Sequence, residues 1–170
     1  MQHPVSESRN NGLMHFNRIT ALLLIAAALS LVVYKALFLP VTHDESYTAV
    51  HYTGFSWLEI IRSPDPSPNN HILNTLITKL LMSYLGISQW VIRIPAIVSF
   101  LLYAFALFRI SRALLTTRSL FFVPAVILFL CNPYLLDFFS LCRGYGMSTA
   151  LVTCSAGFLV TGFMNRRNRD

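Results

Sequence analysis

Long apolar runs alternate with short polar segments along this chain of 170 residues. Four runs approach the length of about 20 residues that a helix needs to cross roughly 30 Å of hydrocarbon. They cover residues 19–39, 90–110, 119–139 and 145–164. This pattern predicts an all-α protein, a polytopic membrane bundle of about four transmembrane helices, with a tail at 1–18, a loop at 40–89 and a basic end at 165–170.

The composition agrees with a membrane protein. Hydrophobic residues make up 55% of the chain and charged residues 12%, whereas soluble domains carry about 25% charged residues. A cleaved signal peptide is the alternative for the first run, because Arg9 and Arg18 precede it. Its apolar core exceeds the roughly 7–15 residues of a signal, and the end at Pro40 offers no small-residue cleavage site. An uncleaved span is therefore predicted.

The lysine and arginine side chains indicate the orientation. With a cytoplasmic N-terminus, the inner segments hold Arg9, Arg18, Arg109, Arg112, Arg118, Arg166, Arg167 and Arg169, and the outer segments hold Arg62, Lys79, Arg93 and Arg143. This asymmetry follows the positive-inside rule. The net charge of +6 is thus explained by topology and does not indicate nucleic-acid binding. Lys35, near the outer end of its span, is expected to extend to the interface.

The outer loop at 40–89 holds four of the seven acidic residues, and a loop this long is usually functional or structured. Thr42 and Glu45 fit a capping box at a helix start, and Ser56 and Glu59 repeat the pattern. A proline-rich segment at 63–68 is expected to be extended. An amphipathic helix follows, with Asn70 as its cap and Gly86 as its stop. These helices are predicted to lie on the outer membrane surface.

Two adjacent carboxylates, Asp44 and Glu45, begin the first of these helices. The capping box uses the Glu45 side chain and leaves Asp44 free, about 100° away around the helix. A carboxylate held at a membrane surface and partly removed from water is suited to act as a general base. Asp44 is therefore the candidate catalytic residue.

Other polar residues have structural interpretations. A metal site from His43, Asp44, His51 and His71 lacks the i, i+4 pair of helical zinc sites, so no metal site is predicted and a divalent cation has little support. Asp65 is interpreted as a turn residue and Asp137 as a solvated acid near a span end. The three cysteines are interpreted as small apolar residues without disulfides: Cys131, Cys142 and Cys154.

The order of several elements resembles the N-terminal part of the C-fold glycosyltransferases. An apolar first span is followed by "HDESY" at 43–47, then Asn70-His71-Ile72, Gly86-Ile87-Ser88 and Arg93-Ile94-Pro95, and finally "CNPYLLDFFSLCRGYGMSTAL" at 131–151. The pattern is closest to the bacterial branch of protein O-mannosyltransferases and of transferases acting on lipid A or lipopolysaccharide cores. The resemblance covers residues 19–159.

This resemblance implies an enzyme of the bacterial inner membrane. It would transfer a sugar from a polyprenyl-phosphate donor to a glycan, lipid or protein acceptor on the outer face. The acid after the first span is catalytic in the family, which implies that role for Asp44, with Glu45 as a substrate-binding neighbour. Direct displacement would invert the sugar carbon.

Three further residues are candidates for substrate binding. Arg143 would pair with the donor phosphate and Tyr145 would add a hydroxyl, although both types also anchor spans at the interface. The resemblance places a histidine at His71, which would contact substrate; capping of the helix is the alternative.

Relatives in this family continue through many more spans. The basic end at 165–170 is similar to a cytoplasmic loop, so the chain is expected to be a fragment, a truncated frame or one half of a split enzyme that a second polypeptide completes. Two other hypotheses are a non-catalytic accessory subunit of envelope assembly, and a transporter. The transporter is disfavoured because ionisable groups are lacking at the span centres.

Overall fold

The computed structural model describes residues 4–63, 65 and 70–167, and every regular element among them is a helix. In chain order these are α1 (Pro4–Phe38), α2 (His43–Val50), the 3-10 turn η1 (Tyr52–Gly54), α3 (Trp57–Arg62), α4 (Ile72–Leu85), α5 (Gln89–Leu115), α6 (Phe122–Leu130), α7 (Pro133–Phe138) and α8 (Gly144–Arg167). The prediction of an all-α protein is confirmed.

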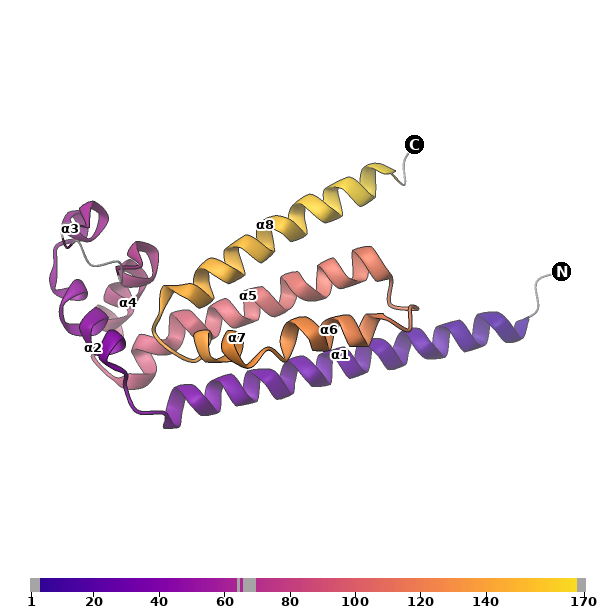
Figure 1. Ribbon diagram of the computed structural model, residues 1–170, viewed down its shortest axis with the longest axis horizontal. Helices are drawn as coiled ribbons and strands as arrows, with labels where there is room; N and C mark the ends of the chain where they lie inside the picture. The colour runs from indigo at the N-terminus through magenta and orange to yellow at the C-terminus, as the bar shows by residue number, and fades with distance from the viewer. Residues whose placement is uncertain (1–3, 64, 66–69, 168–170) are drawn as a thin grey trace.

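Three helices in the described residues are long and apolar enough to cross a membrane, in α1, α5 and α8 (Figure 1). The qualifying segments are Asn11–Phe38, Gln89–Leu115 and Gly144–Arg166. α1 also continues without a break into the predicted N-terminal tail, from Pro4 onward. The start of α1 and the end of α8 lie at one end of the bundle, and α2, α3 and α4 gather at the opposite end (Figure 1).

The third predicted span, at 119–139, is not one helix. Residues 131 and 132 interrupt it, because Asn132 caps a new helix whose first residue is Pro133. Proline lacks the N–H that would bond the Phe129 carbonyl four residues earlier. The Tyr103 hydroxyl of α5 donates to that carbonyl at 2.8 Å. α6 and α7 together return the chain to the end where α2 lies (Figure 1).

Polar contacts join the helices beside an apolar core, which packs α1, α5, α6, α7 and α8 around Phe100, Phe122 and Phe139. The Lys35 ammonium of α1 forms an ion pair with Asp137 of α7. The Asp137 side chain is still 47% exposed, so it is a solvated acid with an added partner. At the other end, the Asn17 amide donates to the carbonyls of Thr117 and Ser119, at 3.0 and 2.9 Å.

Both predicted capping boxes are present. Thr42 caps α2 together with Glu45, and Ser56 caps α3 together with Glu59. The Gly86 stop of α4 is confirmed, with a φ of 80°, a conformation that glycine adopts without strain.

The predicted cap of α4 is wrong. His71 occupies the cap position and makes no side-chain capping bond. The Asn70 amide instead donates to the Ser63 hydroxyl and accepts from the Thr75 hydroxyl, at 3.0 and 3.1 Å. The predicted extended segment 63–68 lies mostly outside the described residues. Asp65, which is described, accepts from the Tyr47 hydroxyl at 3.1 Å and contacts His51 Nε2 at 3.2 Å.

Candidate functional site

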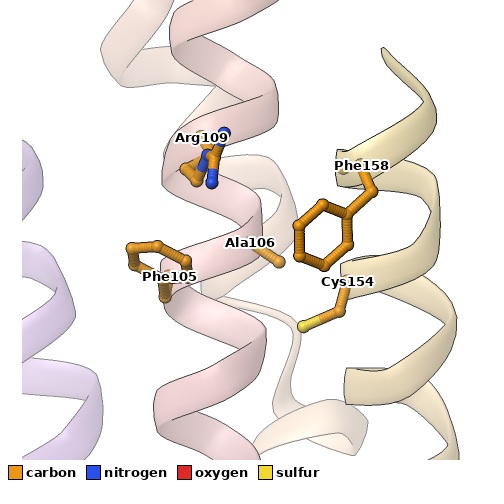
Figure 2. A pocket seen from close by; sticks show the side chains of 6 residues that line it. Phe105, Ala106, Arg109, Cys154 and Phe158 are labelled. Carbon is orange, nitrogen blue, oxygen red and sulfur yellow. The ribbon is translucent and has the colours of Figure 1, made fainter. Parts of the chain in front are cut away.

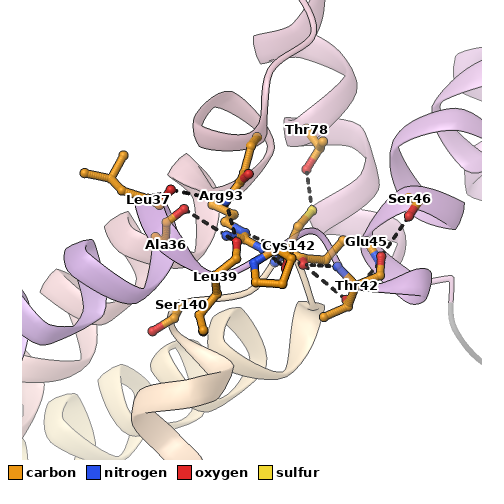
Figure 3. A network of polar contacts seen from close by, with 12 residues as sticks. Ala36, Leu37, Leu39, Thr42, Glu45, Ser46, Thr78, Arg93, Ser140 and Cys142 are labelled. Atoms are coloured by element: carbon orange, nitrogen blue, oxygen red, sulfur yellow. Dashed lines mark hydrogen bonds and ion pairs between the residues drawn. The ribbon is translucent and has the colours of Figure 1, made fainter.

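Glu45 and Arg93 form a fully buried ion pair where α2 meets the long helices of the bundle. Arg93 donates from Nε to one oxygen of the Glu45 carboxylate and from Nη2 to the other, both at 2.7 Å. Both side chains have an exposed fraction of 0%. Such two-pronged geometry suits a guanidinium and a carboxylate, and it fixes α2 against α5 (Figure 3).

The same two side chains also hold main-chain groups. Arg93 Nη1 donates to the carbonyls of Ala36 and Leu39 at 2.9 Å, so it satisfies acceptors at the end of α1. The Glu45 carboxylate accepts from the main-chain N–H of Thr42 at 2.9 Å and of Cys142 at 2.7 Å. A single buried pair therefore joins α1, α2, α5 and the turn before α8.

The pKa of Glu45 reflects these contacts. Burial of the carboxylate acts to raise its pKa, but the hydrogen bonds from Arg93, Cys142 and Thr42 together with the Arg93 charge lower the pKa below its ordinary value. The carboxylate stays ionised, and its acceptor sites are taken by donors of the protein.

Asp44 and Arg143 form a second ion pair, at the surface. Asp44 Oδ2 lies 2.7 Å from Arg143 Nη2, and the exposed fractions of the two side chains are 35% and 31%. Asp44 is the second residue of α2, and Arg143 directly precedes α8. Because Glu45 bonds the main chain of Cys142, the buried pair aligns the residues that flank it, Asp44 and Arg143.

His71 and Tyr145 lie next to this surface pair. Their rings pack edge to face, with centroids 4.6 Å apart. Burial lowers the pKa of His71, and the positive charge of Arg143 lowers it further. Gly144 permits this approach, because a Cβ atom there would lie 2.3 Å from the Cβ and Cγ atoms of His71.

A pocket of about 260 Å³ opens between the first turns of α4 and α8. His71 and Asn74 line it from α4, and Gly144 and Ser148 line it from α8. Neither first turn contains an acidic residue, and no side chain caps α4. Free N–H groups at helix starts favour anions, so a pocket bordered by two such starts is suited to an anionic group.

One buried polar side chain in the pocket wall has an acceptor atom that no described group donates to. Asn74 is 2% exposed, and its Oδ1 atom has no hydrogen-bond partner in the described part of the chain. Its Nδ2 group lies 3.6 Å from the Cys142 sulfur. A buried acceptor normally has a donor, so this oxygen is suited to a ligand hydroxyl.

An apolar groove of about 310 Å³ continues from the pocket along α4, α5 and α8. Leu73, Met147 and Leu151 line both spaces. The groove is therefore suited to a hydrocarbon chain whose polar end lies in the pocket.

Two other cavities in the described part of the chain are not lined by the predicted site residues. A crevice between α5 and α8, near Phe105 and Cys154, has a volume of only about 20 Å³ (Figure 2), room for about one water molecule. A groove of about 340 Å³ between α5, α6 and α8 is apolar and contains none of the predicted site residues. Among residues 4–63, 65 and 70–167 no group of three His, Cys, Asp or Glu side chains is placed to hold a metal ion.

The structure brings four predicted site residues together: Asp44, Arg143, His71 and Tyr145. Glu45 belongs to the buried pair. Arg93 and Asn74 were not predicted as site residues from the sequence, where Arg93 was interpreted as an outer charge and as part of the Arg93-Ile94-Pro95 element. An arginine inside an apolar run is a signal that a buried partner exists, and that signal was available.

Comparisons with protein-family models, with curated proteins and with solved structures each returned no match.

Proposed function

We propose that the chain carries the donor-binding part of a membrane glycosyltransferase, which moves a sugar from a polyprenyl phosphate to an envelope acceptor on the outer face of the bacterial inner membrane. One observation carries the proposal: an acid–guanidinium pair, Asp44 with Arg143, stands beside a pocket between two helix starts, and this pocket continues into an apolar groove. This combination is suited to an amphiphile with an anionic head and a long hydrocarbon tail.

The residues support a direct displacement. Asp44 accepts the proton of an acceptor hydroxyl, and the hydroxyl oxygen forms a bond to the anomeric carbon of the sugar. The bond from that carbon to the phosphate oxygen breaks, and its electron pair leaves with the prenyl phosphate. Attack from the face opposite the phosphate inverts the carbon. Arg143 stabilises the charge on the leaving phosphate.

The neighbouring residues have supporting roles. The pocket wall offers Asn74 Oδ1 to a sugar hydroxyl. His71 is favoured in its neutral form, so its ring offers one donor and one acceptor near the phosphate. Glu45 positions Asp44 and Arg143 and does not bind substrate in this scheme. The proposal orients the start of α1 and the end of α8 toward the cytoplasm, which the positive-inside rule favours.

The test uses the full chain in lipid vesicles with a radiolabelled polyprenyl-phosphate hexose and an envelope extract as acceptor. In the wild type we expect loss of label from the donor and its appearance in acceptor. Asp44→Asn should slow this transfer by about 10²- to 10⁴-fold. Glu59→Gln, which alters an exposed helix cap, should leave the rate unchanged.

An equal rate in Asp44→Asn and the wild type would refute the base assignment. If the wild type is inactive alone, the same variants are compared in cells where a second polypeptide completes the enzyme. Unchanged envelope glycosylation in Asp44→Asn cells would favour the accessory-subunit hypothesis.

A further inference from the structure

In the Asp44–Arg143 pair, the proposed base and the proposed phosphate-binding group contact each other. Asp44 Oδ2 lies 2.7 Å from Arg143 Nη2, so this carboxylate oxygen faces the guanidinium and not an acceptor hydroxyl. About a third of each side chain is exposed, and exposed pairs of this kind are held weakly enough to exchange partners.

Arg143 has a further donor atom besides the one that faces Asp44. Its Nε atom is buried and has no hydrogen-bond partner among the described residues. Its charge acts on His71, which lines the pocket, and it immediately precedes Gly144 in the pocket wall. Arg143 therefore pairs with Asp44 and directly precedes the pocket wall at Gly144 in the chain.

We propose that a phosphate in this pocket competes with Asp44 for Arg143, so that binding of the donor frees the base. In the empty site the guanidinium pairs with Asp44. When the anion enters, it accepts from Arg143 and from the first-turn N–H groups of α4, and Asp44 is released toward the acceptor hydroxyl. The competition couples donor binding to base activation and prevents the base from acting without a donor.

This inference rests on the proposed function, because it assigns the anion and the base by their roles there. It nevertheless predicts a binding property that can be measured without catalysis. If two anions share one guanidinium, removing the charge of one strengthens binding of the other. Asp44 therefore weakens phosphate binding only through Arg143.

The experiment is a double-mutant cycle with the full chain in lipid nanodiscs and farnesyl phosphate as the probe, measured by calorimetry. Asp44→Asn should bind the probe about two- to fivefold more tightly than the wild type, as expected for a part-exposed pair. Arg143→Ala should bind at least about tenfold more weakly. In the Arg143→Ala background, Asp44→Asn should have no further effect.

Farnesol is the uncharged control, and its binding should not change between variants. Circular dichroism confirms that each variant keeps its helical content, and Arg143→Lys, which retains the charge, should restore the effect of Asp44→Asn. If Asp44→Asn tightened probe binding equally with Arg143 present and in the Arg143→Ala background, general charge repulsion would explain the effect. That result would overturn the inference. Weaker binding in Asp44→Asn, or no binding of farnesyl phosphate by the wild type, would also overturn it.

The two proposals fail in different measurements. If Asp44→Asn tightens binding but leaves sugar transfer unchanged, the competition stands and the base assignment fails. If transfer is lost while binding is unchanged, Asp44 is the base and the competition is refuted.

Discussion

Glu45 and Arg93, 48 positions apart in the chain, form a two-pronged ion pair with both side chains fully buried. Each residue of the surface pair, Asp44 and Arg143, is adjacent in sequence to a residue of this buried network. Asp44 is the sequence neighbour of Glu45, and Arg143 follows Cys142, whose N–H donates to the Glu45 carboxylate. A buried pair thus sets the spacing of the exposed one.

Breaking the buried pair should destabilise the protein strongly. Glu45→Gln leaves the Arg93 guanidinium buried without a counter-charge, which costs about 3–5 kcal/mol of unfolding free energy. The double variant with Arg93→Met should lose less than Glu45→Gln alone, because it buries no unpaired charge. Thermal unfolding in detergent, followed by circular dichroism, measures both.

Asp44→Asn is the matched control for this prediction, because it removes the adjacent carboxylate. Its partner is part-exposed, so the loss should be at most about 1 kcal/mol. Equal losses for Glu45→Gln and Asp44→Asn would contradict the structural role of the buried pair.

The lowered pKa of Glu45 predicts how stability depends on pH. The folded carboxylate holds its proton less tightly than the unfolded one, whose ordinary pKa is 4.5. The contribution to stability is therefore complete above pH 4.5 and is lost as the pH falls through the lower folded pKa. Melting temperatures between about pH 6 and pH 3 should fall less steeply in Glu45→Gln than in the wild type.

The pKa of His71 should respond to Arg143. Burial is the larger cause of the lowered pKa, and the Arg143 charge adds to it. Arg143→Gln should therefore raise the pKa toward its ordinary value of 6.5 without reaching it. NMR titration of the His71 ring measures the change, with Arg62→Gln as the control. A lowered pKa in Arg143→Gln would contradict the placement of the guanidinium near His71.

Local features were predictable from the sequence, because they depend on residues close together in the chain. The capping boxes at Thr42 and Ser56 and the stop at Gly86 are examples. The cap at Asn70 failed because its amide bonds the Ser63 and Thr75 hydroxyls instead.

Pairings across the fold were not predictable in the same way. The sequence shows Lys35, Arg93 and Asp137 in or near apolar runs, but it does not show which side chains meet. Hydrocarbon and packed protein both disfavour isolated charges, so each finds a partner from another helix. The role of Asp44 was inferred from what the capping box leaves unused, and the structure adds its contact with Arg143.

Gly144→Ala should disturb the pocket. The added Cβ atom would overlap the His71 ring and displace it from Tyr145. Farnesyl phosphate should then bind at least about tenfold more weakly, because His71 and the α4 start lose their positions. Gly162→Ala in the same helix is the control, since nothing lies within 4 Å of its Cβ position. Equal binding by both variants would contradict the close contact at Gly144.

The interrupted α6–α7 segment depends on a substitute donor from α5. Pro133 has no N–H for the Phe129 carbonyl, and the Tyr103 hydroxyl donates to it instead, at 2.8 Å. Tyr103→Phe removes that donor and leaves the carbonyl unpaired at a depth where water is scarce. We expect a loss of about 1 kcal/mol of unfolding free energy, measured by denaturation in detergent.

Pro133→Ala separates this cause from loss of packing. Alanine restores the missing N–H, so the Phe129 carbonyl regains a donor from its own segment. In that background Tyr103→Phe should cost clearly less than it does in the wild type, and the difference is the coupling between the two sites. If Tyr103→Phe costs the same in both backgrounds, the hydroxyl does not replace the proline N–H, and the Asn132 cap and packing stabilise the interruption at 131–132 without it.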